Sequence, residues 1–337
     1  MRLLILGGTS FVGRAIAVEA VSRNHTVTLL HRGTKPSPDG VTTCIGDRLA
    51  HDGLDALNGM HFDAVLDTWA ADAAPAIHAM EKLKGRFHHY TFISTITIYD
   101  RKLLPSDGAM FDENTAVFDV TAPDASKSVY EFNKRTVEIA AGNILRDVPC
   151  VLARAGVILG PHEQEYTERG RLLWWLDRLG KGGRVVAPEP RDLKLQFVDA
   201  RDLAKFVVDG AEQKLSGAFN IAGEAGATTM GELLEMARQI TGGGSELVWT
   251  DSKRIMDAGV VPFMDLPLWL DPKSDMYRAI YCCDATKAKG AGLVCRPVEE
   301  TVRDTWDWMQ GETGSRPAPN GVRVGGLSKE KESILLG

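Results

Sequence analysis

The chain has 337 residues, of which 44 % are hydrophobic and 25 % are charged, and its formal net charge is −6. These values are ordinary for a globular protein, and the acidic balance argues against a nucleic-acid partner or an anionic membrane surface. No apolar run approaches the roughly 20 residues that a membrane helix needs, so a membrane partner is not expected either.

The first half of the chain alternates short β-rich runs with helical patterns. Several runs are continuously apolar, as expected for strands that are covered on both faces. Alternation of this kind predicts an α/β fold with a parallel, doubly wound sheet of the Rossmann type. The predicted strands are residues 3–6, 26–30, 41–46, 62–68, 89–95 and 149–155, and the predicted helices are 12–22, 74–84 and 126–146.

The alternation weakens after Gly160–Pro161. The pattern predicts a helix, a turn and a strand over 171–186, a strand entering a helix over 195–211, and a strand over 217–223. A helix over 230–242 follows Thr228 and Thr229, which are candidate caps. Residues 251–277 are expected to be irregular, and 298–309 to form a closing helix. Beyond residue 311, the Gly, Pro, Ser and charged residues favour a loose tail.

The motif GGTSFVG begins at Gly7, directly after the first strand, and opens the first helix. This is the position of the dinucleotide-binding fingerprint. Gly7 permits the sharp turn, the backbone N–H groups around Phe11 and Val12 face the pyrophosphate, and Gly13 lets the helix pack closely on the strand. The alternative is a tight turn that holds no ligand.

Ser10 departs from this fingerprint, because a middle glycine usually stands there. Serine lacks the freedom of glycine at positive φ, but its hydroxyl can donate a hydrogen bond to a phosphate oxygen. We therefore expect the Ser10 side chain either to turn away from the pyrophosphate or to bind it.

The end of the second strand distinguishes the two nicotinamide cofactors. A carboxylate there would hold the adenosine ribose of NAD, but this chain has His31, followed by Arg32 and then Lys35. A guanidinium binds phosphate well, which favours NADP(H) over NAD(H); the alternative is that Arg32 is a solvated turn residue. Asp47 could bind the adenine amino group or lie in a surface turn, and Thr68 is a further expected cofactor contact.

A second group of residues indicates acid–base chemistry. The predicted fifth strand ends in hydroxyls, and the following helix carries Tyr130 and Lys134 one turn apart, on one face. A phenol with a pKa of about 10 is a poor catalyst at neutral pH, and an adjacent ammonium lowers that pKa. The pattern predicts that Tyr130 passes a proton while a hydroxyl of the strand binds the substrate oxygen.

These motifs, with VLARAGVILGP, FVDARDLA and FNIAG, resemble the extended short-chain dehydrogenase/reductase superfamily, NAD-dependent epimerase/dehydratase type, over Met1 to about Gln310. The resemblance implies that Thr95, Tyr130 and Lys134 are catalytic, with Lys134 also binding the cofactor. It implies a substrate between a Rossmann domain and a smaller C-terminal lobe. Trp69 and Thr97 are candidate substrate contacts, with ordinary packing as the alternative.

Two departures from the family pattern narrow the expected reaction. Sugar-nucleotide dehydratases of this type carry an Asp-Glu pair after the active-site Thr, where this chain has Ile96 and Thr97. Epimerases of this type usually keep an acidic residue at the end of strand two, where Arg32 follows His31. The GGTSF variant is also similar to an isoflavone-reductase-like or chloroplast RNA-binding-like branch, some members of which lack the Tyr and Lys that are present here.

The sequence as a whole predicts an NADPH-dependent reductase of a carbonyl or imine group in a small metabolite. The alternatives are an NAD-dependent nucleotide-sugar epimerase and a non-catalytic dinucleotide-sensing or RNA-binding protein. The expected domains are an NADP-binding domain over 1–156, with 194–223 returning to it, a substrate lobe mainly over 157–312, and the tail 313–337.

The protein is expected to be a monomer or a homodimer in the cytoplasm. Its five cysteines, with no C-x-x-C spacing, favour a reducing compartment without disulfides or a zinc site. The histidines show no ligand spacing, so no metal is expected. Residues 3–6 are interpreted as a buried strand rather than part of a signal peptide.

Overall fold

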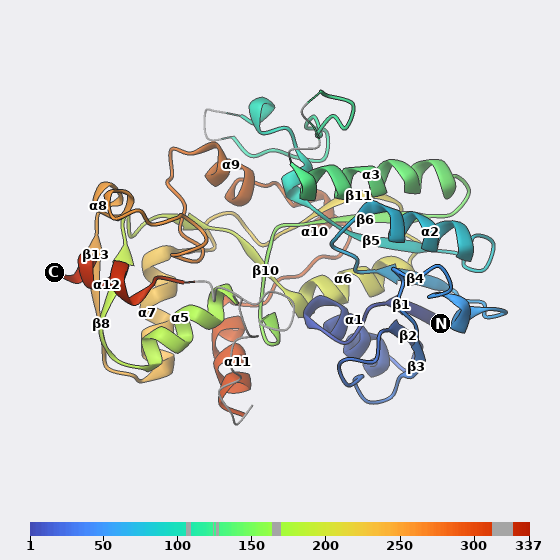
Figure 1. The fold of residues 1–337 in the computed structure, drawn as a ribbon, viewed down its shortest axis with the longest axis horizontal. Coiled ribbons are helices and arrows are strands. Elements are labelled where there is room, and N and C mark those ends of the chain that lie inside the picture. The colour runs from blue at the N-terminus through green and yellow to red at the C-terminus, as the bar shows by residue number, and fades with distance from the viewer. Residues whose placement is uncertain (106–108, 124, 126–127, 164–169, 312–325) are drawn as a thin grey trace. The chain divides into compact units, whose positions relative to one another are not determined.

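The computed structural model describes residues 1–105, 109–123, 125, 128–163, 170–311 and 326–337 (Figure 1). The chain divides into two compact units. Unit 1 comprises residues 1–156, 200–222 and 283–294, and unit 2 comprises 157–199, 223–282 and 295–337. The sequence predicts one return of the chain to the first domain; the structure has two, at 200–222 and at 283–294.

Unit 1 is built on a seven-stranded sheet in the order β11-β6-β5-β4-β1-β2-β3, and all neighbouring strands are parallel. The predicted α/β Rossmann-type fold is thereby confirmed. The apolar strands are buried because helices cover both faces of the sheet. The strands are β1 (Arg2–Leu6), β2 (Thr26–His31), β3 (Thr42–Ile45), β4 (Ala64–Asp67), β5 (Tyr90–Thr95), β6 (Cys150–Ala155) and β11 (Gly217–Ile221).

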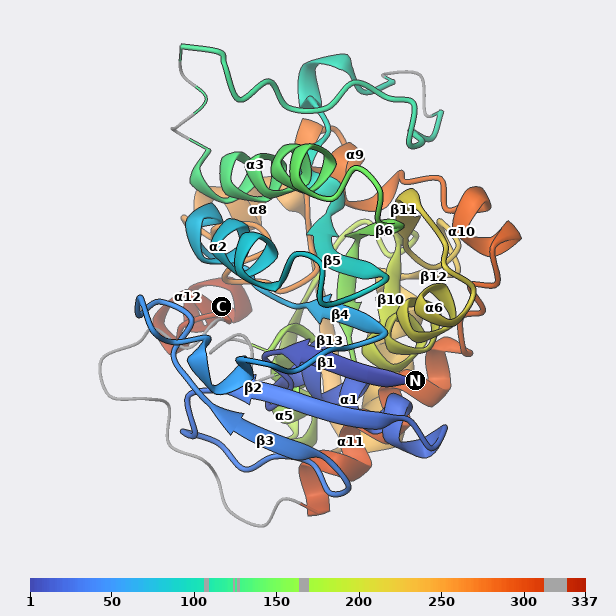
Figure 2. The ribbon, with the colours of Figure 1, turned by 90° about the vertical axis from the view of Figure 1, so that its right-hand side faces the viewer.

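The helices of unit 1 lie in two layers (Figure 2). Helices α1 (Phe11–Ser22) and α6 (Ala200–Glu212) pack against each other on one face, and α2 (Ala73–Leu83) and α3 (Val129–Ile144) pack against each other on the other. The second layer closes a core of sheet and helix residues that includes Leu4, Phe92 and Val137. Short elements of the unit are η1 (Asp55–Leu57), η2 (Ile96–Ile98), η3 (Arg101–Leu103) and α10 (Thr286–Gly290).

Unit 2 has a core of its own around the fully buried Trp175 and Trp269. Its strands pair in twos: β10 (Phe197–Asp199) with β7 (Val157–Leu159), β12 (Thr228–Thr229) with β9 (Lys194–Leu195), and β13 (Ser245–Thr250) with β8 (Gly183–Pro188). Its helices are α5 (Arg171–Gly180), α7 (Met230–Thr241), α8 (Ser252–Asp257), α9 (Asp275–Tyr281), α11 (Val298–Gly311) and α12 (Lys329–Leu336).

Two expectations for unit 2 need correction. The segment 251–277 is not irregular throughout, because Asp251 caps α8 and Ser274 caps α9. The expected loose tail 313–337 includes α12, which Ser328 caps and which buries Leu335 in the core of the unit. Caps and a single buried leucine are weak sequence signals, because neither produces a long periodic pattern. The rest of the tail, up to residue 325, lies outside the described residues.

Two properties of the described residues bear on partners. None of their helices combines the length and the apolar character needed to cross a bilayer. Nor do their His, Cys, Asp and Glu side chains gather into a group that could hold a metal ion.

Candidate active site

The turn between β1 and α1 has the geometry that a dinucleotide cradle requires. Gly7 and Gly8 have φ values of +116° and +95°, a region that favours glycine. A Cβ on Gly13 would lie 2.7 Å from the backbone nitrogen of Gly8, so the first turn of α1, which includes Phe11 and Val12, packs directly on the loop. The residues present therefore fit a nicotinamide dinucleotide at this turn, and the backbone can approach it closely.

Ser10 does not need the conformational freedom of glycine. Its φ of −135° and ψ of 144° are ordinary extended values, and its side chain makes no capping hydrogen bond to α1. The Ser10 hydroxyl instead accepts a hydrogen bond of 2.9 Å from Nζ of Lys35. The departure from the fingerprint thus brings a cation to the first turn of the α1 helix.

The loop after β2 is held in place by the ring of His31. Its Nδ1 accepts from the backbone N–H of Gly33 at 3.0 Å, and its Nε2 lies 2.9 Å from the hydroxyl of Ser37. Burial lowers the pKa of His31, so the ring is neutral at pH 7. Arg32 is exposed next to it, and the segment 31–37 contains no carboxylate.

Asp47 and Thr68 are both engaged in local structure. The Asp47 carboxylate accepts from the backbone N–H of Leu49 at 3.1 Å, as in a surface turn. The Thr68 hydroxyl donates to the carbonyl of Leu6 at 3.0 Å and would lie 2.5 Å from a Cβ on Gly7. Thr68 therefore packs against the glycine turn, and its contact with the cofactor stays a prediction.

Helix α3 carries Tyr130 and Lys134 on one face. Lys134 is only 3 % exposed, and its Nζ donates to the carbonyls of Trp69 and Ile93, each at 2.6 Å. The same ammonium lies 4.6 Å from the ring centre of Phe92 and 5.9 Å from that of Tyr130. Burial lowers the pKa of Lys134 to about 7, against the raising effect of nearby carboxylates. Tyr130 itself is 42 % exposed, so its ring is accessible to a reactant.

Thr95 is the last residue of β5 and is nearly buried. Its hydroxyl accepts from the backbone N–H of Thr97 at 3.2 Å and lies 3.2 Å from the Thr97 hydroxyl. The turn η2 that follows packs against α3. The strand end with the two threonines and the helix face with Tyr130 and Lys134 therefore belong to one unit and meet at Ile93, whose carbonyl binds Lys134.

Trp69 makes contacts that favour its packing role. Its indole N–H donates to the carbonyl of Asp72 at 2.6 Å, and the Arg48 guanidinium lies 4.9 Å from its ring centre. Arg48 in turn forms a buried, two-pronged ion pair with Asp67 at 2.7 and 2.8 Å. The backbone carbonyl of Trp69 is the part that reaches Lys134.

Comparison with known proteins shows the family to which a chain with this geometry belongs. The model of the family described as NAD dependent epimerase/dehydratase matches residues 3–222. The chain belongs to this family. It is therefore an enzyme of the extended short-chain dehydrogenase/reductase type with a nicotinamide dinucleotide cofactor. Among curated proteins none matches the chain, and the isoflavone-reductase-like branch stays a prediction.

Many solved structures share the fold of the epimerase/dehydratase family member described here. A UDP-glucose 4-epimerase from Thermotoga maritima, solved with UDP-glucose, is 17 % identical at a TM-score of 0.70, covering 92 % of this chain and 99 % of that one. A UDP-glucose 4-epimerase from Thermus thermophilus in complex with NAD is 19 % identical at 0.66, covering 93 % and 100 %. A nucleoside-diphosphate-sugar epimerase from Pseudomonas aeruginosa is 16 % identical at 0.66, covering 93 % and 98 %.

Sequence reasoning missed several groups of this enzyme's site. Asp67, Arg48 and Glu138 were not identified, because a buried ion pair between distant segments leaves no local pattern. Glu138 stands four residues after Lys134, and this spacing was the available signal. The sequence indicates Lys35 only as a cation near Arg32, since its contact with Ser10 depends on the path of the loop.

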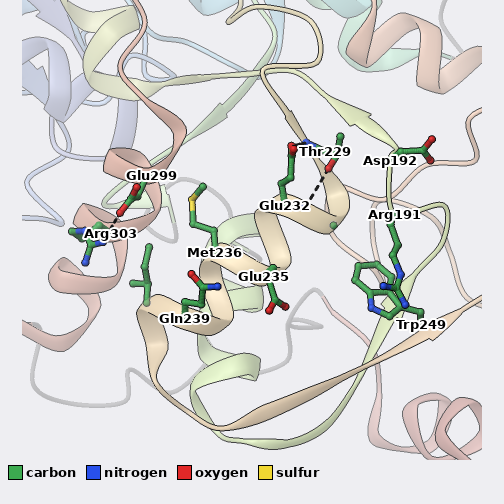
Figure 3. A pocket seen from close by; sticks show the side chains of 12 residues that line it. Arg191, Asp192, Thr229, Glu232, Glu235, Met236, Gln239, Trp249, Glu299 and Arg303 are labelled. Atoms are coloured by element: carbon green, nitrogen blue, oxygen red, sulfur yellow. Dashed lines mark hydrogen bonds and ion pairs between the residues drawn. The ribbon is translucent and has the colours of Figure 1, made fainter.

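Unit 2 also contains an open groove of about 980 Å³ beside α7 (Figure 3). Several of its charged side chains already have partners. Arg303 pairs with Glu299 at 2.6 Å, and the Arg191 guanidinium lies 4.4 Å from the ring centre of Trp249. Glu232 caps α7 together with Thr229. None of the predicted catalytic or cofactor residues lines this groove.

Proposed function

We propose that this enzyme is an NADPH-dependent reductase of a carbonyl or imine group in a small metabolite. The observation that carries the proposal is the α3 face on which the Lys134 ammonium lies 5.9 Å from the ring of Tyr130 and binds the carbonyl of Ile93, two residues before Thr95. Bound NADPH would supply the hydride. Tyr130 would supply the proton, and Thr95 would hold the substrate oxygen by a hydrogen bond.

Preference for NADPH is supported by the surroundings of the first βα turn. Lys35 binds Ser10 at the start of α1, and Arg32 is exposed on the same loop. The segment 31–37 contains no carboxylate that could bind the ribose hydroxyls by which NAD differs from NADP. A phosphate on that ribose would meet two cations, Arg32 and Lys35, and no carboxylate of the segment 31–37.

A nucleotide-sugar epimerase is the second candidate. It is favoured by the family match and by the neighbours solved with UDP-glucose and with NAD. Such an enzyme would retain NAD and interconvert sugars without net oxidation. The mass of any ligand that copurifies with the protein distinguishes the two candidates: retained NAD supports the epimerase.

The test of the reductase is Tyr130→Phe. We expect this variant to lose carbonyl reduction, because the phenyl ring has no proton to give, while NADPH still binds. The measurement is NADPH oxidation in the presence of a panel of small ketones, with NADPH affinity from fluorescence titration as the control. Near-wild-type turnover by the variant would show that the mechanism is wrong.

A further inference from the structure

A row of polar side chains crosses the sheet of unit 1 just below the catalytic strand end. Ser94 of β5 is paired with Arg154 of β6, and Arg154 is paired with Asn220 of β11. In a parallel sheet, residues paired in register lie side by side on the same face. All three are at most 5 % exposed, so this row is buried where apolar side chains would normally pack.

Glu138 of α3 lies over this row and joins two of its members, Ser94 and Arg154. The carboxylate accepts from the Ser94 hydroxyl at 2.7 Å and from Arg154 at 3.1 and 3.0 Å. Arg135, one turn earlier on the same helix, adds a bond of 3.1 Å. Glu138 is 3 % exposed, so these four bonds satisfy a carboxylate that water does not solvate.

The network continues to the far end of η2. Arg154 donates to the hydroxyl of Tyr99 at 2.9 Å, and that hydroxyl donates to the side-chain carbonyl of Asn220 at 2.7 Å. Ser94 immediately precedes Thr95, and Tyr99 immediately follows η2. The turn with the two threonines is thus anchored on both sides, and α3 is anchored to it through Glu138.

A gain in the free energy of unfolding does not by itself explain this network. A buried ion pair contributes little net free energy compared with apolar side chains of the same volume, because both charges lose their hydration. It does impose one geometry, since each donor and acceptor must meet its partner. The geometry imposed here is that of α3 against the end of β5.

Glu138 also supplies a negative charge one helical turn beyond Lys134. Two carboxylates, Asp67 and Glu138, raise the pKa of Lys134 against the effect of burial. The charge of Asp67 is opposed by its partner Arg48, which lowers that pKa. Glu138 thereby favours the ammonium form of a lysine that burial would otherwise neutralise.

We propose that Glu138 is a positioning residue of the active site, whose carboxylate bridges Ser94 and Arg154 and so fixes Lys134 and Tyr130 on α3 relative to Thr95. This inference rests on the proposed function in taking these three residues as the catalytic groups. Glu138 touches neither substrate nor cofactor in this role; it acts through α3 and β5.

The experiment compares Glu138→Gln with Glu131→Gln. Glutamine keeps the shape and an acceptor for Ser94 but removes the charge. Glu131 is the matched control, because it lies on the same helix and pairs with Arg101 at 2.7 Å. The first readout is kcat for NADPH-dependent reduction of small ketones. The second is the titration of Lys134, followed by the NMR signal of its labelled side-chain nitrogen. That signal is assigned by its loss in Lys134→Arg.

We expect Glu138→Gln to lower the midpoint of the Lys134 titration by about one pH unit and kcat by about tenfold. Glu131→Gln should change neither. A folded Glu138→Gln protein that keeps either the wild-type midpoint or the wild-type kcat overturns the proposal. The midpoint is the readout that a merely structural loss of packing would not move.

Ser94→Ala tests the geometric part separately and guards against misfolding of the glutamine variant. It removes one bond to Glu138 while the carboxylate and Arg154 remain paired. We expect kcat to fall severalfold with an unchanged Lys134 midpoint; unchanged kcat would contradict the bridging role. If the wild-type enzyme reduces no carbonyl substrate, the proposed function fails, and the Lys134 midpoint in Glu138→Gln still decides whether Glu138 acts on Lys134.

Discussion

At the scale of single residues, the site depends on charges that are removed from water. Lys134 is buried against two backbone carbonyls and an aromatic ring. Because burial removes this ammonium from water, it titrates at a lower pH than a solvated one. The lysine therefore changes its charge near neutral pH, where an enzyme can use the difference.

The first prediction concerns the pH dependence of reduction. Because the pKa of Lys134 is lowered to about 7, raising the pH through this value removes the ammonium, and kcat/KM is expected to fall on the alkaline side. Lys134→Arg keeps its charge at every accessible pH, so its lower activity should lack this alkaline decline. Profiles of kcat/KM against pH for both proteins are the measurement. Identical declines would assign the titration to another group.

The proposed preference for NADPH can be tested at Lys35. In Lys35→Glu, a carboxylate would replace the cation at Ser10. The charged hydrogen bond from Lys35 to the ribose phosphate of NADPH, of ~1.5–3 kcal/mol, would then be lost. We expect NADPH to bind about 10- to 100-fold more weakly, with NADH little affected. The control is Lys84→Glu, an exposed lysine at the end of α2. Equal losses for NADPH and NADH would refute the role of Lys35.

At the scale of elements, close backbone approach at the β1–α1 turn is the feature that limits substitution. The helix begins within contact distance of the loop that precedes it, so no side chain fits between them. The same helix–loop unit presents the backbone N–H groups at the start of α1. Its geometry serves both packing and cofactor binding.

Gly13→Ala should therefore be costly. Its Cβ would lie 2.7 Å from backbone of Gly8, so α1 must shift, and we expect a loss of ~1–3 kcal/mol in the free energy of unfolding together with weaker NADPH binding. Gly142→Ala is the matched control in α3. Apart from its chain neighbours and the backbone of its own helix, its Cβ would have no described atom within 4 Å, and the change is expected to stabilise the protein by ~0.5–1 kcal/mol. Denaturant unfolding and NADPH titration measure both effects.

At the scale of the whole molecule, the chain forms two units with separate cores and crosses between them several times. The proposed cofactor and catalytic residues all belong to unit 1. The last described helix, α12, belongs to unit 2, where Arg178 pairs with Glu332 at 2.8 Å and Leu335 is buried. The residues of α12 thus stabilise unit 2.

Because the two units have separate cores, we expect a cavity-forming substitution in the core of unit 2 to leave cofactor binding intact. Leu335→Ala should lower the free energy of unfolding by ~2–4 kcal/mol, because a buried leucine leaves a cavity. Ile334→Ala, at an adjacent residue that is 57 % exposed, should have almost no effect. NADPH affinity at a temperature where both variants are folded should equal that of the wild type. A large loss of affinity in Leu335→Ala alone would contradict the division.

The periodic and local features of this protein could be predicted from its amino-acid sequence. Short β-rich runs, several of them continuously apolar, predicted the six strands of the first half, because strands that are buried on both faces are rich in apolar side chains. The positions of Gly7 and Gly13, and the one-turn spacing of Tyr130 and Lys134, followed from backbone geometry alone. Helix α7 was predicted with Thr228 and Thr229 as candidate caps, and the structure shows that Thr229 is the cap, in a capping box with Glu232.

The contacts between distant segments, in contrast, are seen only in the folded chain. Lys35 and Ser10 are joined by the path of a loop, and Asp67 finds Arg48 only when β3 and β4 take their places in the sheet. Ser94, Glu138 and Arg154 meet because two strands are in register beneath one helix. Helix α12 and the second return at 283–294 likewise depend on long-range packing. Hydrogen bonds and ion pairs of this kind depend on distance in space, and nothing in the local pattern of the chain encodes it.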